Sequence, residues 1–108
     1  MSISKNRRRP GVRRPRRHRW ELRVYVANRA ERSLLTVTNL QRLCEQCIPG
    51  QYQIEIIDLL KSPERCRDDQ IVAVPTVVRH LPLPQRRVIG TLADAVRAAE
   101  GLEFPAVN

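Results

Sequence analysis

The sequence has few of the residues that usually build a catalytic or cofactor site. Its four Gly are scattered, so no glycine-rich loop is present to hold a phosphate. It has two His, and neither a Gly-x-Ser-x-Gly nor a His-x-x-x-His pattern. No apolar run approaches the ~20 residues that a membrane-spanning helix needs. These absences favour a binding protein over an enzyme, with no cofactor and no contact with a membrane.

Acidic residues are missing from the start of the chain. Nine of the 20 Lys and Arg lie in residues 1–19, so residues 20–108 hold 11 bases and 11 acids and are formally neutral. We predict that residues 1–19 are a disordered arginine-rich arm, that residues 20–104 form one domain, and that residues 105–108 are a tail. Such an arm would bind polyanions, including nucleic acid, through charge alone. A nucleic-acid-associated protein is therefore one alternative function.

Cysteine is also scarce, and the count of three is odd. Reduced thiols in a cytoplasmic protein are the simplest explanation, and no apolar segment follows the basic start as it would in a secretory signal. Cys44-Glu-Gln-Cys47 matches the spacing of redox motifs. Both thiols fall near the C-terminal end of a predicted helix, where the helix dipole raises a thiol pKa, so we interpret them as small buried side chains. A thioredoxin-like redox protein remains an alternative. A zinc site would need Cys44, Cys47, Cys66 and either His18 or His80, and the spacing does not indicate one.

Hydrophobic periodicity predicts a strand, a helix and a second strand in the first half of the domain. Alternation predicts the first strand over 20–27, and apolar positions three and four apart predict a helix over 33–48. The next run, 52–60, is nearly continuous in apolar character, which predicts a central strand covered on both faces. Only four aromatic residues are present, so aliphatic side chains must supply the core.

The second half is predicted to hold a short helix, a hairpin and a final helix. Ser62-Pro63 is typical of a helix start, and that helix is expected over 63–70. Runs 76–80 and 86–89 predict an antiparallel hairpin. Thr91 is expected to cap the last helix, Gly101 to end it, and its apolar stripe to comprise Leu92, Ala95, Val96 and Ala99. The resulting α/β order, βαβαββα, is thioredoxin-like, and Pro75, directly before the third strand, is expected to be cis.

The body of the chain resembles the KaiB family of small clock proteins. The resemblance runs from about Glu21 to Leu102 and is carried by four segments: Leu22-Arg-Val-Tyr-Val-Ala27, Ile56-Ile-Asp-Leu-Leu-Lys-Ser-Pro63, Ala73-Val-Pro-Thr76 and Leu81-Pro-Leu-Pro-Gln-Arg-Arg-Val-Ile-Gly90. It implies a cytoplasmic, non-enzymatic regulator that binds a KaiC-type ATPase ring and opposes its KaiA-stimulated phosphorylation. It also implies competition with histidine-kinase sensor domains of the same fold.

The resemblance implies site residues and a second fold as well. Lys61, Arg86 and Arg87 match basic residues that the family uses near its KaiC contact or for stability. The family rests as an oligomer, which implies a dimer or tetramer, with a differently packed C-terminal half that becomes thioredoxin-like on binding. The residues expected to take part in that fold switch are Pro75, Pro82, Pro84 and Gly90.

Overall fold

The computed structural model describes residues 19–27 and 30–105. The elements follow in the order β1 (Trp20–Val26), α1 (Glu31–Cys47), β2 (Tyr52–Asp58), the 3₁₀ helix η2 (Pro63–Arg67), β3 (Thr76–Leu81), β4 (Arg86–Ile89) and α2 (Ala95–Leu102). This confirms the predicted α/β order. The predictions for nearly all of the arm and for most of the tail fall outside the described residues.

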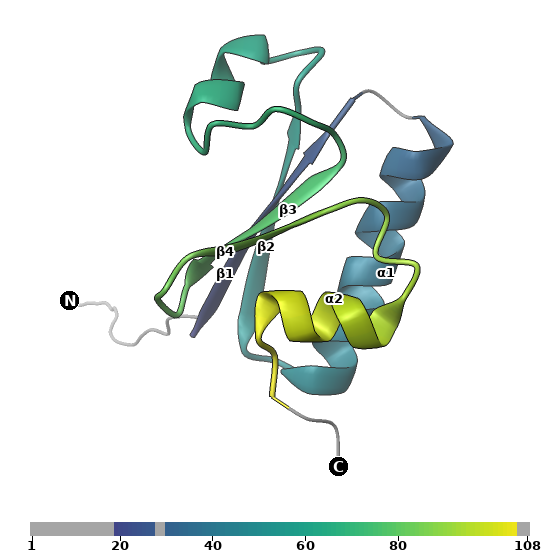
Figure 1. Ribbon diagram of the computed structural model, residues 1–108, viewed down its shortest axis with the longest axis vertical. Helices are drawn as coiled ribbons and strands as arrows, with labels where there is room; N and C mark the ends of the chain where they lie inside the picture. Colours follow the sequence, from purple (N-terminus) through teal and green to yellow (C-terminus); the bar gives the residue numbers. More distant parts are fainter. Residues whose placement is uncertain (1–18, 28–29, 106–108) are drawn as a thin grey trace, which may run out of the picture.

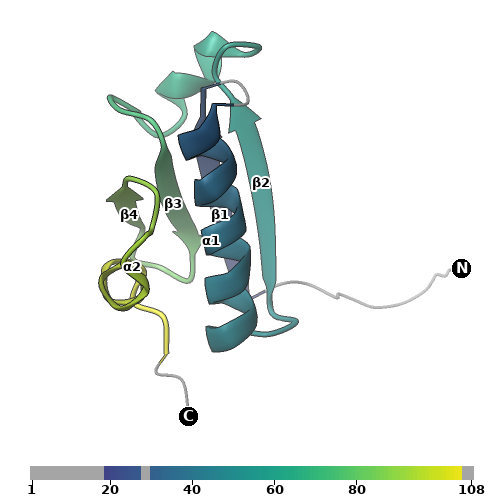
Figure 2. The same ribbon diagram turned by 90° about the vertical axis from the view of Figure 1, so that its right-hand side faces the viewer.

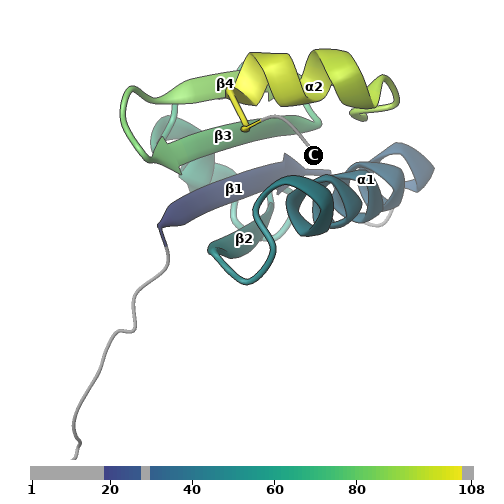
Figure 3. The same ribbon diagram turned by 90° about the horizontal axis from the view of Figure 1, so that it is seen from below.

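The strands form one mixed sheet in the order β2-β1-β3-β4. β1 pairs parallel with β2 and antiparallel with β3, and β3 pairs antiparallel with β4, as the hairpin prediction required. Both α-helices lie on the same face of the sheet, and η2 lies near the end at which α1 begins (Figure 1, Figure 2). Figure 3, seen from below, shows the helix layer on one side of the strands.

The main core lies between the sheet and the two helices. Because side chains alternate along a strand, Leu22 and Val24 of β1 and Val77 of β3 point toward the helices, and each is at most 2% exposed. Leu40 and Cys44 of α1 pack against them. The buried residues of this core are mostly aliphatic, as the shortage of aromatic residues required.

The prediction that the second strand is central is wrong. β2 is an edge strand, and its Ile56 is 52% exposed. The crossover from β1 places β2 on one side of β1, and the β3–β4 hairpin then occupies the other side. The nearly continuous apolar run therefore belongs to a partly exposed edge strand rather than to a buried central strand.

The boundaries of α2 also differ from the prediction. Asp94, not Thr91, is the N-cap, and its side chain accepts a hydrogen bond from the backbone N–H of Arg97 at 3.1 Å. The first turn therefore begins three residues later than expected and turns Val96 outward, where it is 68% exposed. The buried residues of α2 are Ala98 and Leu102.

Gly101 does not end α2 but lies inside it. A Cβ at this position would stand 2.7 Å from Cγ2 of Val88, so glycine permits the close approach of α2 to β4. The helix ends instead where Glu103 takes a left-handed conformation, with φ 56°.

A segment that we call the strap, residues 59–75, joins β2 to β3 and carries η2. The predicted helix over 63–70 is a single short 3₁₀ helix, and the Ser62 side chain makes no capping hydrogen bond. The backbone holds the strap at its two ends. Leu59 N donates to Val26 O at 2.9 Å, and Gly90 N donates to Pro75 O at 2.9 Å.

Candidate docking surface on the open sheet face

The face of the sheet that turns away from the helices is polar around a small apolar centre. The alternation that buries Leu22 and Val24 on one side turns Arg23 and Tyr25 to the other. Tyr25 forms a small buried cluster there with Ile57 and Val78. The strap packs against this open face through partly buried apolar side chains, namely Leu59 and Ile71.

A buried carboxylate of the strap is the centre of this surface. The Asp69 side chain is 2% exposed, and its Oδ2 accepts hydrogen bonds from the Tyr25 hydroxyl at 2.5 Å and from Arg23 at 3.3 Å. Nε2 of His80 lies 2.9 Å from the same oxygen. The Gln85 side chain donates to Oδ1 at 3.0 Å. One strap residue is thus bonded to β1, to β3 and to the β3–β4 loop, as a buried charge requires.

These contacts shift the ionisation of both acidic groups. Burial alone would raise the pKa of Asp69, but hydrogen bonds from Tyr25 and His80, with the charges of His80 and Arg23, lower the pKa of Asp69 overall. Burial and the hydrogen bond to Asp69 raise the pKa of Tyr25 to about 12. At neutral pH, Asp69 is therefore a carboxylate and Tyr25 a neutral donor.

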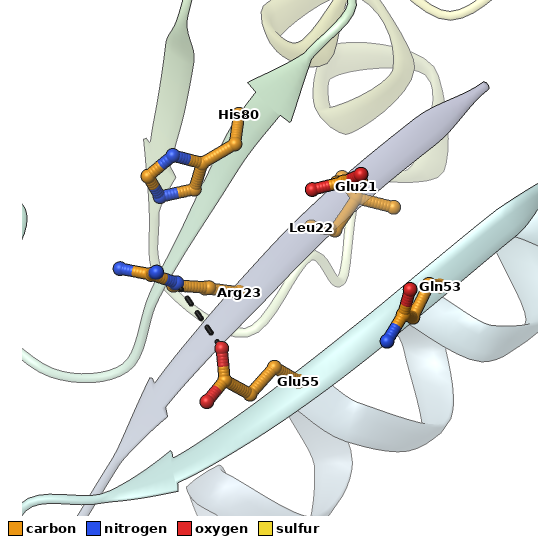
Figure 4. A pocket seen from close by; sticks show the side chains of 6 residues that line it. All are labelled: Glu21, Leu22, Arg23, Gln53, Glu55 and His80. Atoms are coloured by element: carbon orange, nitrogen blue, oxygen red, sulfur yellow. Dashed lines mark ion pairs between the residues drawn. The ribbon is translucent and has the colours of Figure 1, made fainter. Parts of the chain in front are cut away.

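A more exposed ion network surrounds the buried carboxylate. Nε of Arg23 lies 3.2 Å from a carboxylate oxygen of Glu55, and NH1 of Arg23 lies 3.7 Å from Asp68. Arg65 of η2 contacts Asp68 at 2.6 Å and Glu55 at 3.3 Å. Figure 4 shows Arg23 between the ring of His80 and Glu55. These side chains line a depression of about 130 Å³. Because these groups are partly or fully exposed, each such pair contributes little to stability.

The structure does not bring the three predicted contact residues together. Arg87 lies on the open face and donates to the strap's main chain, at 2.7 Å to Asp69 O and at 3.4 Å to Gln70 O. Lys61 is exposed near the start of the strap. Arg86 precedes Arg87 in β4, points to the helix side and pairs with Glu103 at 2.8 Å. Only Lys61 and Arg87 therefore share the strap side of the molecule.

The four predicted switch residues lie in the segments before, within and after the β3–β4 hairpin. Val74–Pro75, Leu81–Pro82 and Leu83–Pro84 are cis peptide bonds, which confirms the prediction for Pro75. Gly90 has a φ of 115°, in the region that favours glycine. It lies between β4 and the loop that leads to α2.

The two CxxC thiols lie at the C-terminal end of α1, as predicted. Cys44 is fully buried and burial raises the pKa of its thiol to about 12, while burial also raises the pKa of the half-buried Cys47. Neither environment stabilises a thiolate. Within residues 19–27 and 30–105, no group of three or more His, Cys, Asp or Glu side chains is arranged to hold a metal ion. No helix in those ranges is long and apolar enough to cross a membrane.

Sequence reasoning missed two charged residues that organise the fold. Asp69 stands in the run Arg67-Asp68-Asp69, which is typical of a solvated loop. Arg79 lies within the β3 pattern, yet it is 2% exposed and donates to Leu102 O at 2.8 Å and to Pro84 O. Its guanidinium also lies 5.5 Å from the Trp20 ring centroid. For Arg79 the only sequence signal was a charged residue within a strand, and Asp69 had no local signal because its tyrosine partner lies 44 residues away along the chain.

Comparison with known proteins gives one family and one fold. The family model described as the KaiB domain matches residues 23–104. The chain is 34% identical to the circadian clock protein KaiB3 of Synechocystis sp. over 77% of its own length and 81% of that protein. It is 39% identical to the circadian clock oscillator protein KaiB of Nostoc punctiforme over 77% of its length and 80% of that protein.

Solved structures show the same fold at low sequence identity. The N-terminal domain of SasA from Synechococcus elongatus superposes with a TM-score of 0.63 at 16% identity, covering 81% of this chain and 86% of that domain. Mitochondrial thioredoxin 3 of Saccharomyces cerevisiae superposes with a TM-score of 0.62 at 15% identity, covering 81% of this chain and 79% of that protein. Both matches confirm a thioredoxin-like arrangement.

Proposed function

Because the chain belongs to the KaiB family of circadian clock proteins, we propose that it is a non-enzymatic regulator that docks onto a KaiC-type ATPase ring. Docking would modulate the phosphorylation or ATPase state of that ring and act against a KaiA-like activator or a histidine-kinase sensor domain. The family match over residues 23–104 is the observation that carries this proposal. The protein would act in the cytoplasm and rest as a dimer or tetramer.

The open face and the strap supply the docking surface in this proposal. Lys61 is exposed, and Arg87 is held against the strap by its main-chain carbonyls. Charged groups at the edge of a contact steer association and fix its register more than they add affinity. Arg86 is assigned a supporting role through Glu103, since it lies on the other side of the sheet.

A change of fold would accompany docking. Residues 63–102 comprise short elements joined by loops with Pro75, Pro82, Pro84 and Gly90, whereas β1, α1 and β2 form a compact unit of local order. A resting state with a repacked second half would make binding slow, because only the thioredoxin-like fraction would bind.

Thiol redox catalysis is disfavoured by the positions of the cysteines. A reactive thiolate needs an electropositive, accessible setting such as a helix N-terminus. Here both thiols lie at the C-terminal end of α1, where the helix dipole raises a thiol pKa. Burial also raises the pKa of Cys44 to about 12.

The decisive experiment is co-purification with the KaiC-type ATPase of the same organism, in ATP and in ADP, followed by size-exclusion chromatography. We expect a complex in at least one nucleotide state. The variants to compare with the wild type in this assay are Lys61→Ala and Arg87→Ala on the docking surface. Arg97→Ala on α2 is the control, as an exposed basic residue outside that surface. Absence of a complex in both nucleotide states would refute the proposal.

A further inference from the structure

The strap is attached to the open face at its two ends, through one buried carboxylate, and through Arg87, which donates to the main-chain carbonyls of Asp69 and Gln70. Between the backbone bonds at Leu59 and Pro75, its apolar contacts are few, since Leu60 is 66% exposed and Val72 is 90% exposed. The ion pairs of Arg65 with Asp68 and Glu55 are solvent-exposed and therefore weak. Most of the directional attachment in the middle of the strap thus comes from Asp69.

The donors to Asp69 come from parts of the sheet that are far apart in sequence. Arg23 and Tyr25 belong to β1, His80 to β3 and Gln85 to the following loop, at distances of 2.5–3.3 Å. Removing this carboxylate would leave the buried Tyr25 hydroxyl and part of Arg23 without their acceptor. The resulting loss of stability is larger than the stability that an exposed ion pair provides.

We propose that Asp69 is the positioning residue of the docking surface and that it holds the strap closed over the open face. When this carboxylate is lost, residues 59–75 open as a local unit while the helix layer stays folded. The inference rests on the proposed function only where it concerns docking. The closed strap is the competent state, because it presents Lys61 and, through Asp69 O and Gln70 O, orients the guanidinium of Arg87.

Two adjacent aspartates allow a matched test. Asp69→Asn keeps the size of the buried side chain and removes its charge, while Asp68→Asn makes the same change on a side chain that is 36% exposed. Hydrogen exchange of the free protein should rise about tenfold or more in residues 59–75 of D69N, and by a clearly smaller factor in α1 and α2. D68N should change exchange in the strap by less than about twofold.

A merely structural role would give a different pattern. If Asp69 only contributed to global stability, D69N would raise exchange in the strap and in both helices by the same factor, and the proposal would be wrong. Unchanged exchange in the strap would also overturn it. Alkylation of Cys66, which is half-buried in η2, gives an independent readout and should accelerate in D69N but not in D68N.

Weaker variants keep the test available if D69N does not fold. Gln85→Ala and His80→Ala each remove one side chain from the carboxylate and leave its charge in place. Each should raise hydrogen exchange in the strap by a smaller factor than loss of the Asp69 carboxylate would, and the double variant should raise it further. No rise in either variant or in the double variant would overturn the proposal.

Binding measurements separate this inference from the proposed function. If wild-type protein binds the KaiC-type ATPase, D69N should bind about tenfold or more weakly, and Arg97→Ala on α2 should bind nearly normally. Normal binding by a D69N protein with an open strap would overturn the positioning role. If the wild type does not bind but strap exchange responds as described, the strap attachment stands and the proposed function fails.

Discussion

At the scale of single residues, the ionisation of Asp69 predicts how stability depends on pH. Its pKa is lower in the folded chain than the ordinary value of about 4, so it contributes stability that is fully present above that value. This contribution is lost as the pH falls through the folded pKa. We expect the free energy of unfolding, measured with urea, to decrease below about pH 4.

Substitution shows whether Asp69 causes that decrease. Asp69→Asn cannot ionise, so its unfolding free energy should be lower at pH 6 and should change less between pH 6 and pH 3. Asp68→Asn should retain most of the wild-type pH dependence. Equal slopes for the wild type and D69N would contradict the assignment.

The buried thiol gives a second prediction at this scale. Because burial raises the pKa of Cys44 to about 12, its thiolate fraction at pH 8 should be roughly a thousandfold lower than in the unfolded chain. Alkylation with iodoacetamide, followed by mass spectrometry, should therefore be slow for Cys44 and fast once guanidinium is added. Rapid labelling of Cys44 in the folded protein would reopen the redox interpretation.

At the scale of elements, Arg79 of β3 fixes the position of α2. It donates to Leu102 O at the end of the helix and to Pro84 O in the hairpin loop, and it lies over Trp20. Within the described residues its Nε has no hydrogen-bond partner. Arg79→Met should reduce the unfolding free energy by about 2–4 kcal/mol, since one buried and one partly buried carbonyl lose their donor.

The neighbouring strand supplies the control for this prediction. Arg86→Met removes a partly exposed pair with Glu103 and should cost less than about 1 kcal/mol. Urea unfolding can be followed by the fluorescence of Trp20, whose ring packs edge-on against Phe104 at 5.1 Å between centroids. Equal losses for the two variants would show that Arg79 has no special role in anchoring α2.

The elements also show which features the sequence could predict. Alternation in β1 and the apolar spacing in α1 are local patterns, and both elements were located within about two residues. The edge position of β2 depends on where the hairpin pairs, which is a long-range choice. The role of Asp69 was invisible for the same reason, because its partners lie 11 to 46 residues away along the chain.

At the scale of the whole molecule, charge is concentrated outside the neutral domain. Nine of the 20 basic residues precede Trp20, and the net charge of the chain is +9. Trp20 itself packs against Phe104 and Arg79, so stacking on nucleobases would compete with contacts that hold the fold. We therefore expect any polyanion binding to depend on charge alone, with no preference for sequence.

Deletion of residues 1–19 tests this expectation. The full chain should be retained on heparin and should bind DNA duplexes of unrelated sequence equally, with an affinity that falls steeply as salt is raised. The deleted chain should lose both properties and keep its hydrogen-exchange pattern in β1 and α1. If the arm serves only polyanions, deletion should leave the complex with the KaiC-type ATPase unchanged. Retention on heparin after the deletion would instead place the basic surface on the folded domain, whose 11 bases are balanced by 11 acids.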